Sequence, residues 1–257
     1  MQFKQNSKFK RWRRLGFYSS ALLLIVSLVG CGRPETRVEH GVREQILHIG
    51  NGTEPQDLDP GIITGVQEYH VIMSLLEGLV SEDPVDLHPV PGVAASWDIS
   101  PGNTVYTFHL RHNAKWSNGE PVTERDFLES YKRILTPSLA SEYSYMHFVV
   151  KNAEAYNEGK LTNFNEVGYK VLDDYTFQVT LNYSTPYFLS LLLHHSWYPV
   201  HLPTIRKYGD PYKRGNHWTR PGHFVGNGAF ALAKWQVNNV VLVKKSPTYW
   251  DKDRVRL

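Results

Sequence analysis

Histidines in the last third of the chain are the first residues whose type suggests chemistry. Neutral imidazoles bind zinc, copper or nickel, and this region holds His194, His195, His201, His217 and His223. The sequence supplies no matched carboxylate, and adjacent histidines on a helix point about 100° apart. We therefore interpret these histidines as exposed residues or as caps near helix ends, and we predict no metal site.

A pair of acidic residues, Asp173-Asp174, has the form of the two carboxylates used in glycoside hydrolysis. A turn before a strand explains the pair more simply, because Asp favours turns. The sequence lacks Gly-x-Ser-x-Gly, His-Glu-x-x-His and both glycine-rich phosphate-binding patterns. We therefore predict that the protein is not an enzyme and needs no cofactor; a hydrolase that uses the histidines or the aspartates is the minor alternative.

Cys31 is the only cysteine, which excludes a disulfide within the chain and a metal site built on thiols. It follows Leu28-Val29-Gly30, and these four residues resemble a bacterial lipobox, where a lipid is attached to the cysteine. The uncharged stretch over 15–30 is shorter than the roughly 20 residues of a spanning helix and matches a secretory signal. We predict a signal peptide over 1–30 and a lipid on Cys31 that holds the body at a membrane. The alternative is an ordinary signal followed by an incidental cysteine.

The positive charge of the chain is concentrated in this signal. Residues 1–30 carry six basic residues and no acid, so the net charge of +3 becomes −3 for the remainder. A mildly acidic body without a Lys/Arg stripe lacks what phosphate binding requires. Nucleic acid is therefore not an expected partner, and a composition of 41% hydrophobic residues is enough to bury a core.

The elements that must position these residues follow from periodicity. Residues 31–45 are charged and lack an apolar period, which indicates a tether. Val105–Leu110 alternates like a half-buried strand, and Thr123–Asp126 has the form of a capping box that starts a helix through Leu135. Further predictions are strands over 46–49 and 176–181, helices over 68–77, 146–158 and 186–193, and a hairpin with strands over 228–232 and 240–243. Without a strict βαβ rhythm, this order indicates a mixed α/β architecture.

Short strings occur in order from about residue 46 to the end. They include 51–60 (NGTEPQDLDP), 75–80 (LLEGLV), 91–97 (PGVAASW), 106–111 (YTFHLR), 114–119 (AKWSNG), 186–188 (PYF), 218–222 (WTRPG), 227–230 (NGAF) and 247–250 (PTYW). Together they resemble the family 5 extracellular solute-binding proteins, the peptide receptors of ABC importers, with spacing most similar to the oligopeptide branch.

The resemblance implies an α/β fold, the mixed-sheet periplasmic-binding-protein fold of type II, cluster C, in incomplete form. It assigns residues 46–76 and 202–257 to lobe one, the second of these segments truncated, and 77–201 to the small extra domain of the peptide-binding branch. Family members are longer and have a second lobe that closes on the ligand. We therefore expect this polypeptide alone to bind peptide weakly.

The resemblance also implies a binding site. In the family, the loop after the Leu-Asp-Pro motif runs beside the peptide and offers main-chain groups, which here belong to Thr64, Gly65, Val66 and Gln67. Tyr143, after the first capped helix, takes the place of a tyrosine that reaches the peptide. An extended peptide held as an added strand pairs through its backbone, and hydrated side-chain pockets tolerate many sequences. The family often has an acidic residue at the position of Thr64, so a charged contact is not predicted there.

By this resemblance the protein is an extracytoplasmic lipoprotein that captures oligopeptides and delivers them to the permease subunits of an ABC transporter, acting as a monomer. Gly32 after the lipidated cysteine favours the outer membrane if the host is Gram-negative. Murein tripeptide, haem and nickel stay open as cargo, because relatives diverge in this way. The alternative is a truncated, non-transporting fragment with a structural or interaction role at the surface.

Overall fold

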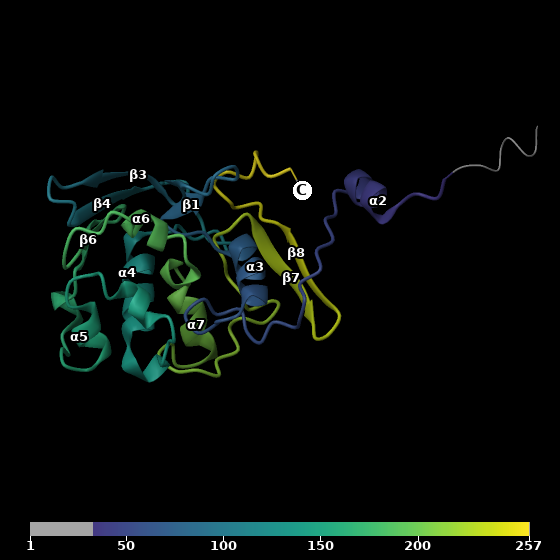
Figure 1. The fold of residues 1–257 in the computed structure, drawn as a ribbon. Helices are drawn as coiled ribbons and strands as arrows, with labels where there is room; N and C mark the ends of the chain where they lie inside the picture. The colour runs from purple at the N-terminus through teal and green to yellow at the C-terminus, as the bar shows by residue number, and fades with distance from the viewer. Residues whose placement is uncertain (1–32, 257) are drawn as a thin grey trace, which may run out of the picture. The chain divides into compact units, whose positions relative to one another are not determined.

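The computed structural model describes residues 33–256, which fall into two compact units, 33–49 and 50–256 (Figure 1). The predicted signal peptide and Cys31 lie outside the described residues. Within residues 33–256, no helix combines the length and the apolar character that crossing a membrane requires.

The first unit adds a helix to the predicted tether and contradicts the strand predicted after it. The expected tether contains a helix, α2 (Arg37–Glu44), which begins at a capping box: the Thr36 N–H donates to Glu39 Oε2 at 2.8 Å, and the Glu39 N–H donates to Thr36 Oγ1 at 3.1 Å. This box supplies partners for backbone groups that a helix start otherwise leaves free. The strand expected over 46–49 is absent, since these residues are exposed and have no strand partner among the described residues.

The second unit holds a four-stranded sheet in the order β3-β4-β6-β5. Its strands are β3 (Ala94–Ile99), β4 (Val105–Leu110), β5 (Tyr169–Asp173) and β6 (Thr176–Thr180). Tyr106, Phe108 and Leu110 of β4 are buried on one face, as their alternation predicts. The strand expected over 176–181 is confirmed as β6, one residue shorter.

Two smaller sheets complete the β structure: β1 (Val80–Glu82) with β2 (Pro89–Pro91), and β7 (Phe230–Gln236) with β8 (Val240–Lys245). The second pair is the predicted hairpin, and Asn238 in its turn has a φ of 56°. Every strand pair within residues 33–256 is antiparallel. The mixed sheet expected from the resemblance is therefore not formed by these residues, because none of their strands returns beside another in the same direction.

Helix α4 (Glu124–Leu135) lies against the four-stranded sheet (Figure 1) and begins at the predicted capping box. The Thr123 N–H donates to Asp126 Oδ2 at 2.8 Å. The buried rings of Phe127 and Tyr131 face Phe177 of β6 at centroid distances of 6.3 and 5.8 Å. These large buried aromatic contacts fix the helix on the sheet.

The helix expected over 146–158 is wrong in its extent. The chain forms a short 3₁₀ turn over Ser144–His147 and then α5 (Ala153–Asn157), separated at Asn152, whose φ is 61°. His147 is drawn into the core, where it stacks on Trp197 at 3.7 Å and its Nδ1 lies 2.7 Å from the Tyr169 hydroxyl. A left-handed residue cannot continue a right-handed helix, so the helix is interrupted.

Three further helices belong to this unit: α3 (Val66–Leu75), α6 (Phe188–Leu191) and α7 (Leu202–Tyr208). Helix α3 starts two residues before the predicted 68–77 helix and ends two residues earlier. The helix expected over 186–193 is confirmed in shorter form as α6.

Candidate functional site

A buried ion pair fixes the loop that precedes α3. Asp59 and Arg133 of α4 have side chains 3% and 2% exposed, and the guanidinium contacts both carboxylate oxygens, at 2.9 and 2.5 Å. The Trp218 indole N–H also donates to Asp59 at 3.2 Å, and Arg133 Nε donates to the Pro211 carbonyl at 2.6 Å. A buried ion pair holds a structure together only when its remaining hydrogen bonds are satisfied, and here the partners come from three separate segments.

The same aspartate turns the chain toward the site. Its backbone carbonyl accepts from the N–H groups of Ile62 and Ile63, and its carboxylate accepts from the Gly61 N–H at 2.9 Å. The next carbonyl along the chain, on Pro60, accepts from Nδ1 of His195 at 2.9 Å. The segment from 59 to 63 is therefore fixed by hydrogen bonds and by the ion pair of Asp59. It leads directly into residues 64–67, where α3 begins.

The backbone of the loop residues is extended and largely unpaired. Gly65 has φ −91° and ψ 150°, and its carbonyl is occupied by the Tyr69 N–H of the first helical turn. The N–H and C=O of Thr64 and the N–H groups of Gly65 and Val66 make no hydrogen bond within residues 33–256. Main-chain groups that are exposed and unpaired can pair with an added strand.

The space at Gly65 is limited by neighbouring side chains, and its φ is one that any residue adopts. A Cβ at this position would overlap the Glu68 carboxylate and the Gln67 side-chain amide. Glu68 is only 2% exposed, and its Oε1 accepts from the Gln56 N–H at 2.8 Å and from Gln67 Nε2 at 3.3 Å. Any larger residue at 65 would therefore displace the carboxylate.

A pocket of about 300 Å³ opens beside this loop. It is lined by Gln56, Asp57, Ile62, Ile63, Thr64, Gly65, Gln67, Glu68, Glu142 and Arg214. Three of the four predicted loop residues thus share one pocket. The fourth, Val66, is not part of the lining and is 65% exposed.

Tyr143 lies next in the chain to the pocket residue Glu142 but does not itself line the pocket. Its ring meets the edges of His194 and His195 at centroid distances of 4.6 and 5.3 Å. Because His195 also binds the Pro60 carbonyl, Tyr143 is linked to the loop through this histidine. Burial lowers the pKa of His194 to about 4 and also lowers that of His195, so both rings are neutral at pH 7.

Seven of the ten pocket residues were not predicted as site residues from the sequence, and the charged ones among them are Asp57, Glu68, Glu142 and Arg214. Glu68 has the pattern of an acidic residue in a first helical turn, which ordinarily faces solvent. Its short distance in sequence from the loop was the one available signal. Glu142 and Arg214 are far apart in sequence and meet only through the fold.

The residues first considered for chemistry have structural roles. His201 caps α7 and contacts Glu120, and His223 Nδ1 lies 3.0 Å from the His217 carbonyl. The turn predicted at Asp173 is confirmed, since its carboxylate accepts from the Tyr175 N–H at 2.9 Å, which lowers the pKa of Asp173. Among the described residues, the one close trio of metal-binding types is Asp83, Asp86 and His88, beside the β1–β2 turn.

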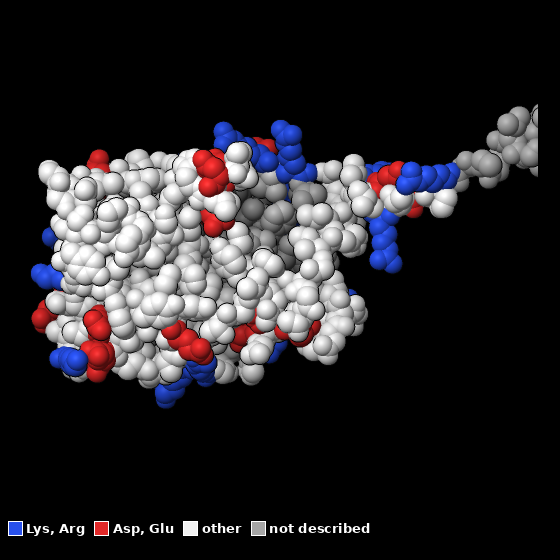
Figure 2. Space-filling view, in the orientation of Figure 1, with Lys and Arg blue, Asp and Glu red and all other residues white. Residues whose placement is uncertain are grey.

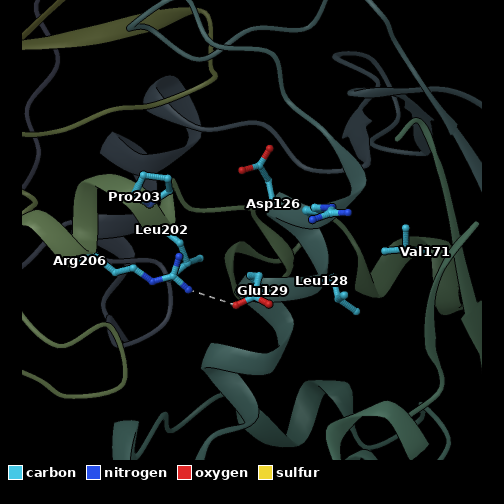
Figure 3. A pocket seen from close by; sticks show the side chains of 8 residues that line it. Asp126, Leu128, Glu129, Val171, Leu202, Pro203 and Arg206 are labelled. Carbon is cyan, nitrogen blue, oxygen red and sulfur yellow. Dashed lines mark ion pairs between the residues drawn. The ribbon is translucent and has the colours of Figure 1, made fainter. Parts of the chain in front are cut away.

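A second pocket, of about 450 Å³, lies between α4, β5 and α7 (Figure 3). Arg206 and Glu129 form an ion pair of 3.5 Å across it. No predicted site residue lines this pocket. On the face of residues 50–256 seen in Figure 2, acidic and basic side chains lie scattered near the edges, and no basic stripe crosses this face.

Comparison with known proteins gives a consistent assignment. Residues 88–257 match the model of the bacterial extracellular solute-binding proteins, family 5 Middle. The periplasmic oligopeptide-binding protein OppA of Escherichia coli is 44% identical over 210 residues, covering 81% of this chain and 37% of that protein. The dipeptide-binding protein DppE of Bacillus subtilis is 34% identical over 256 residues, covering 96% of this chain and 46% of that protein. The chain therefore spans less than half the length of these relatives.

Solved structures agree. OppA of Haemophilus influenzae, in complex with the peptide RPPGFSPFR, superimposes with a TM-score of 0.74 at 38% identity, over 79% of this chain and 39% of that chain. The murein tripeptide binding protein MppA of Escherichia coli gives a TM-score of 0.72 at 34% identity, over 78% of this chain and 38% of that one. The fold is thus that of part of a periplasmic peptide-binding protein. The chain belongs to the family 5 bacterial extracellular solute-binding proteins, which bind solutes and are not enzymes.

Proposed function

We propose that this protein serves peptide uptake: it captures oligopeptides outside the cytoplasm and delivers them to the permease of an ABC transporter. The observation that carries this proposal is a set of main-chain groups beside a pocket of about 300 Å³: the N–H groups of Thr64, Gly65 and Val66 and the Thr64 carbonyl make no hydrogen bond within residues 33–256. The buried Asp59–Arg133 pair holds this backbone in place before any ligand arrives, which lowers the entropy cost of binding.

Backbone pairing explains how such a receptor accepts many sequences. A peptide added as a strand forms its hydrogen bonds through N–H and C=O groups that nearly every peptide has. Thr64, Gly65, Val66 and Gln67 would contact the peptide backbone, and Tyr143 would lie along it. Side chains would enter hydrated space such as the pocket, where water completes their hydrogen bonds.

The predicted lipid on Cys31 would tie the protein to a membrane surface, the outer membrane if the host is Gram-negative. Its named relatives in Escherichia coli and Haemophilus influenzae are periplasmic proteins. Metabolic labelling with a radioactive fatty acid tests the anchor. We expect the wild-type protein to be labelled and Cys31→Ala to be unlabelled; a labelled Cys31→Ala variant would contradict the anchor.

Peptide capture is tested with the intact gene product that carries this sequence. Calorimetry compares a tripeptide with the same tripeptide methylated on its central backbone nitrogen, which removes one donor and leaves the side chains unchanged. We expect the unmethylated peptide to bind about tenfold more tightly, since one lost hydrogen bond of roughly 1.4 kcal/mol changes affinity tenfold. Equal binding of the two peptides would contradict backbone pairing, and no binding of any peptide would contradict the proposed function.

A further inference from the structure

We propose that the pocket beside the loop selects a cationic group of the ligand, an ammonium or a guanidinium, and that Glu68 provides the countercharge. This inference rests on the proposed peptide-binding function and adds the chemistry of the group that the pocket accepts. It follows from four features of the pocket: the state of the Glu68 carboxylate, the charges around it, the position of the one lining cation, and the side chain that covers the carboxylate.

The Glu68 carboxylate is only half satisfied. Its Oε1 accepts from the Gln56 N–H and from Gln67 Nε2, whereas Oε2 has no hydrogen-bond partner within residues 33–256. With 2% of the residue exposed, water replaces little of the missing partner. A buried carboxylate oxygen without a donor is unfavourable, so this arrangement fits a group whose donor comes from a ligand.

The charges that line the pocket favour a cation. Three carboxylates, those of Asp57, Glu68 and Glu142, line it together with a single cationic side chain, Arg214. The Asp57 carboxylate is engaged by its own turn, accepting from the N–H groups of Leu58 at 2.7 Å and Asp59 at 3.1 Å. The two backbone N–H groups stabilise the negative charge of Asp57 at the pocket surface, and neither of them is a cation that would neutralise it.

Arg214 does not neutralise Glu68. Its Nε donates to the Leu139 carbonyl at 3.2 Å and its Nη2 to the Ala140 carbonyl at 2.5 Å. The carboxylate within ion-pair distance of it is Glu142, at 4.0 Å. The guanidinium is thus held by the segment after α4, and the Glu68 carboxylate is left without a positive partner among the described residues.

The Gln67 side chain is what a ligand would displace to reach the Glu68 carboxylate. Its amide covers the carboxylate through a long bond of 3.3 Å and is itself only partly buried. Rotation of this partly exposed side chain is a small change, and an ammonium that replaced its amide would exchange a weak neutral contact with the carboxylate for a charge-assisted one. Charge-assisted hydrogen bonds are about twice as strong as neutral ones.

The cation can come from a Lys or Arg side chain or from the peptide's amino terminus. Four matched tripeptides separate the two sources: Ala-Lys-Ala, Ala-norleucine-Ala, and both peptides acetylated at the amino terminus. Norleucine keeps the aliphatic length of lysine without its charge. Calorimetry on the intact gene product measures all four against wild type, Glu68→Gln and the control Glu158→Gln, which removes an exposed carboxylate paired with Lys160.

We expect wild type and Glu158→Gln to prefer the peptide with the relevant cation by about tenfold, and Glu68→Gln to lose that preference while it still binds the neutral peptide. If the lysine peptides bind more tightly than the norleucine peptides, the cation in the pocket is the lysine side chain. If the free peptides bind more tightly than the acetylated ones, the cation is the peptide's amino terminus. Equal binding of all four peptides by wild type, or an unchanged preference in Glu68→Gln, would overturn the inference and leave peptide capture standing. Absence of binding by all four would instead count against the proposed function.

A second variant protects the test if Glu68→Gln folds poorly. Gln67→Lys leaves Glu68 in place and puts the protein's own ammonium beside it. We expect this variant to lose the preference for cationic peptides as well, at unchanged melting temperature. Retention of the full preference would contradict the role of Glu68.

Discussion

Single residues decide whether the loop backbone is available to a ligand. Val66 is the first residue of α3 and is largely exposed, and Gly65 before it is extended. Proline is well tolerated at a first helical position and after an extended residue. We therefore expect Val66→Pro to keep the melting temperature within a few degrees while it removes one free N–H. A fall in peptide affinity of severalfold by calorimetry would follow if this N–H pairs with the ligand; Val66→Ala, which keeps the N–H, is the control.

The Asp59–Arg133 pair gives a stability prediction at the same scale. Asp59→Asn leaves a buried guanidinium without its countercharge, which costs roughly 3–5 kcal/mol of unfolding free energy. Urea denaturation measures this loss. The double variant Asp59→Asn with Arg133→Met removes both charges and should recover part of the stability; a single variant as stable as wild type would show that the pair does not hold the loop.

His147 links burial to pH. Burial lowers its pKa from 6.5 to about 3, so the folded protein binds fewer protons on this ring than the unfolded chain between these values. Stability from this group is therefore complete above pH 6.5 and is lost as the pH falls toward 3. We expect the unfolding free energy to decline over this window, and the decline to be shallower in His147→Gln. Equal slopes for the two proteins, measured by urea denaturation at several pH values, would contradict this.

At the scale of elements, capping residues were the most useful signals in the sequence. The box at Thr123 and Asp126 correctly located α4, and Thr36 with Glu39 would have revealed α2 in the same way. We expect Thr123→Ala to cost about 1 kcal/mol, the usual value for a lost cap. Urea denaturation tests this, with Thr107→Ala on the sheet as a comparison.

Other elements depend on contacts that no local pattern contains. The helix expected over 146–158 breaks because His147 finds partners on β5 and near Trp197, both distant in sequence. The apolar residues at 46–49 have strand propensity, but no strand within residues 33–256 pairs with them. In the site, Thr64, Gly65 and Gln67 followed from resemblance, whereas Glu142 and Arg214 required the fold. Periodicity in the sequence indicates which face of a helix or strand is apolar. It does not indicate which other element packs against that face.

At the scale of the whole unit over 50–256, one glutamate connects distant parts of the chain. The Glu77 carboxylate accepts from the Tyr249 hydroxyl and the Trp250 indole N–H, both at 2.6 Å. Asn227 brackets its backbone, accepting from the Glu77 N–H at 3.0 Å and donating to the Glu77 carbonyl at 2.9 Å. Through these bonds the last part of the chain is attached directly after α3, the helix that begins at the site.

This connection predicts how the unit opens. Glu77→Ala leaves the half-buried donors of Tyr249 and Trp250 without their acceptor. A fully buried donor left unpaired costs roughly 1–3 kcal/mol, and a half-buried one costs less because water replaces part of the lost bond. We expect hydrogen exchange in β7 and β8 to accelerate strongly, with a smaller effect in α4. Because α3 contacts β7, its amides should accelerate with the hairpin, and the loop at Thr64–Gln67 would lose its support. Tyr249→Phe, which removes one donor together with its bond, should have a much weaker effect. Uniform acceleration across the unit would instead show that residues 50–256 open as a single cooperative body, so that the site and the four-stranded sheet unfold together.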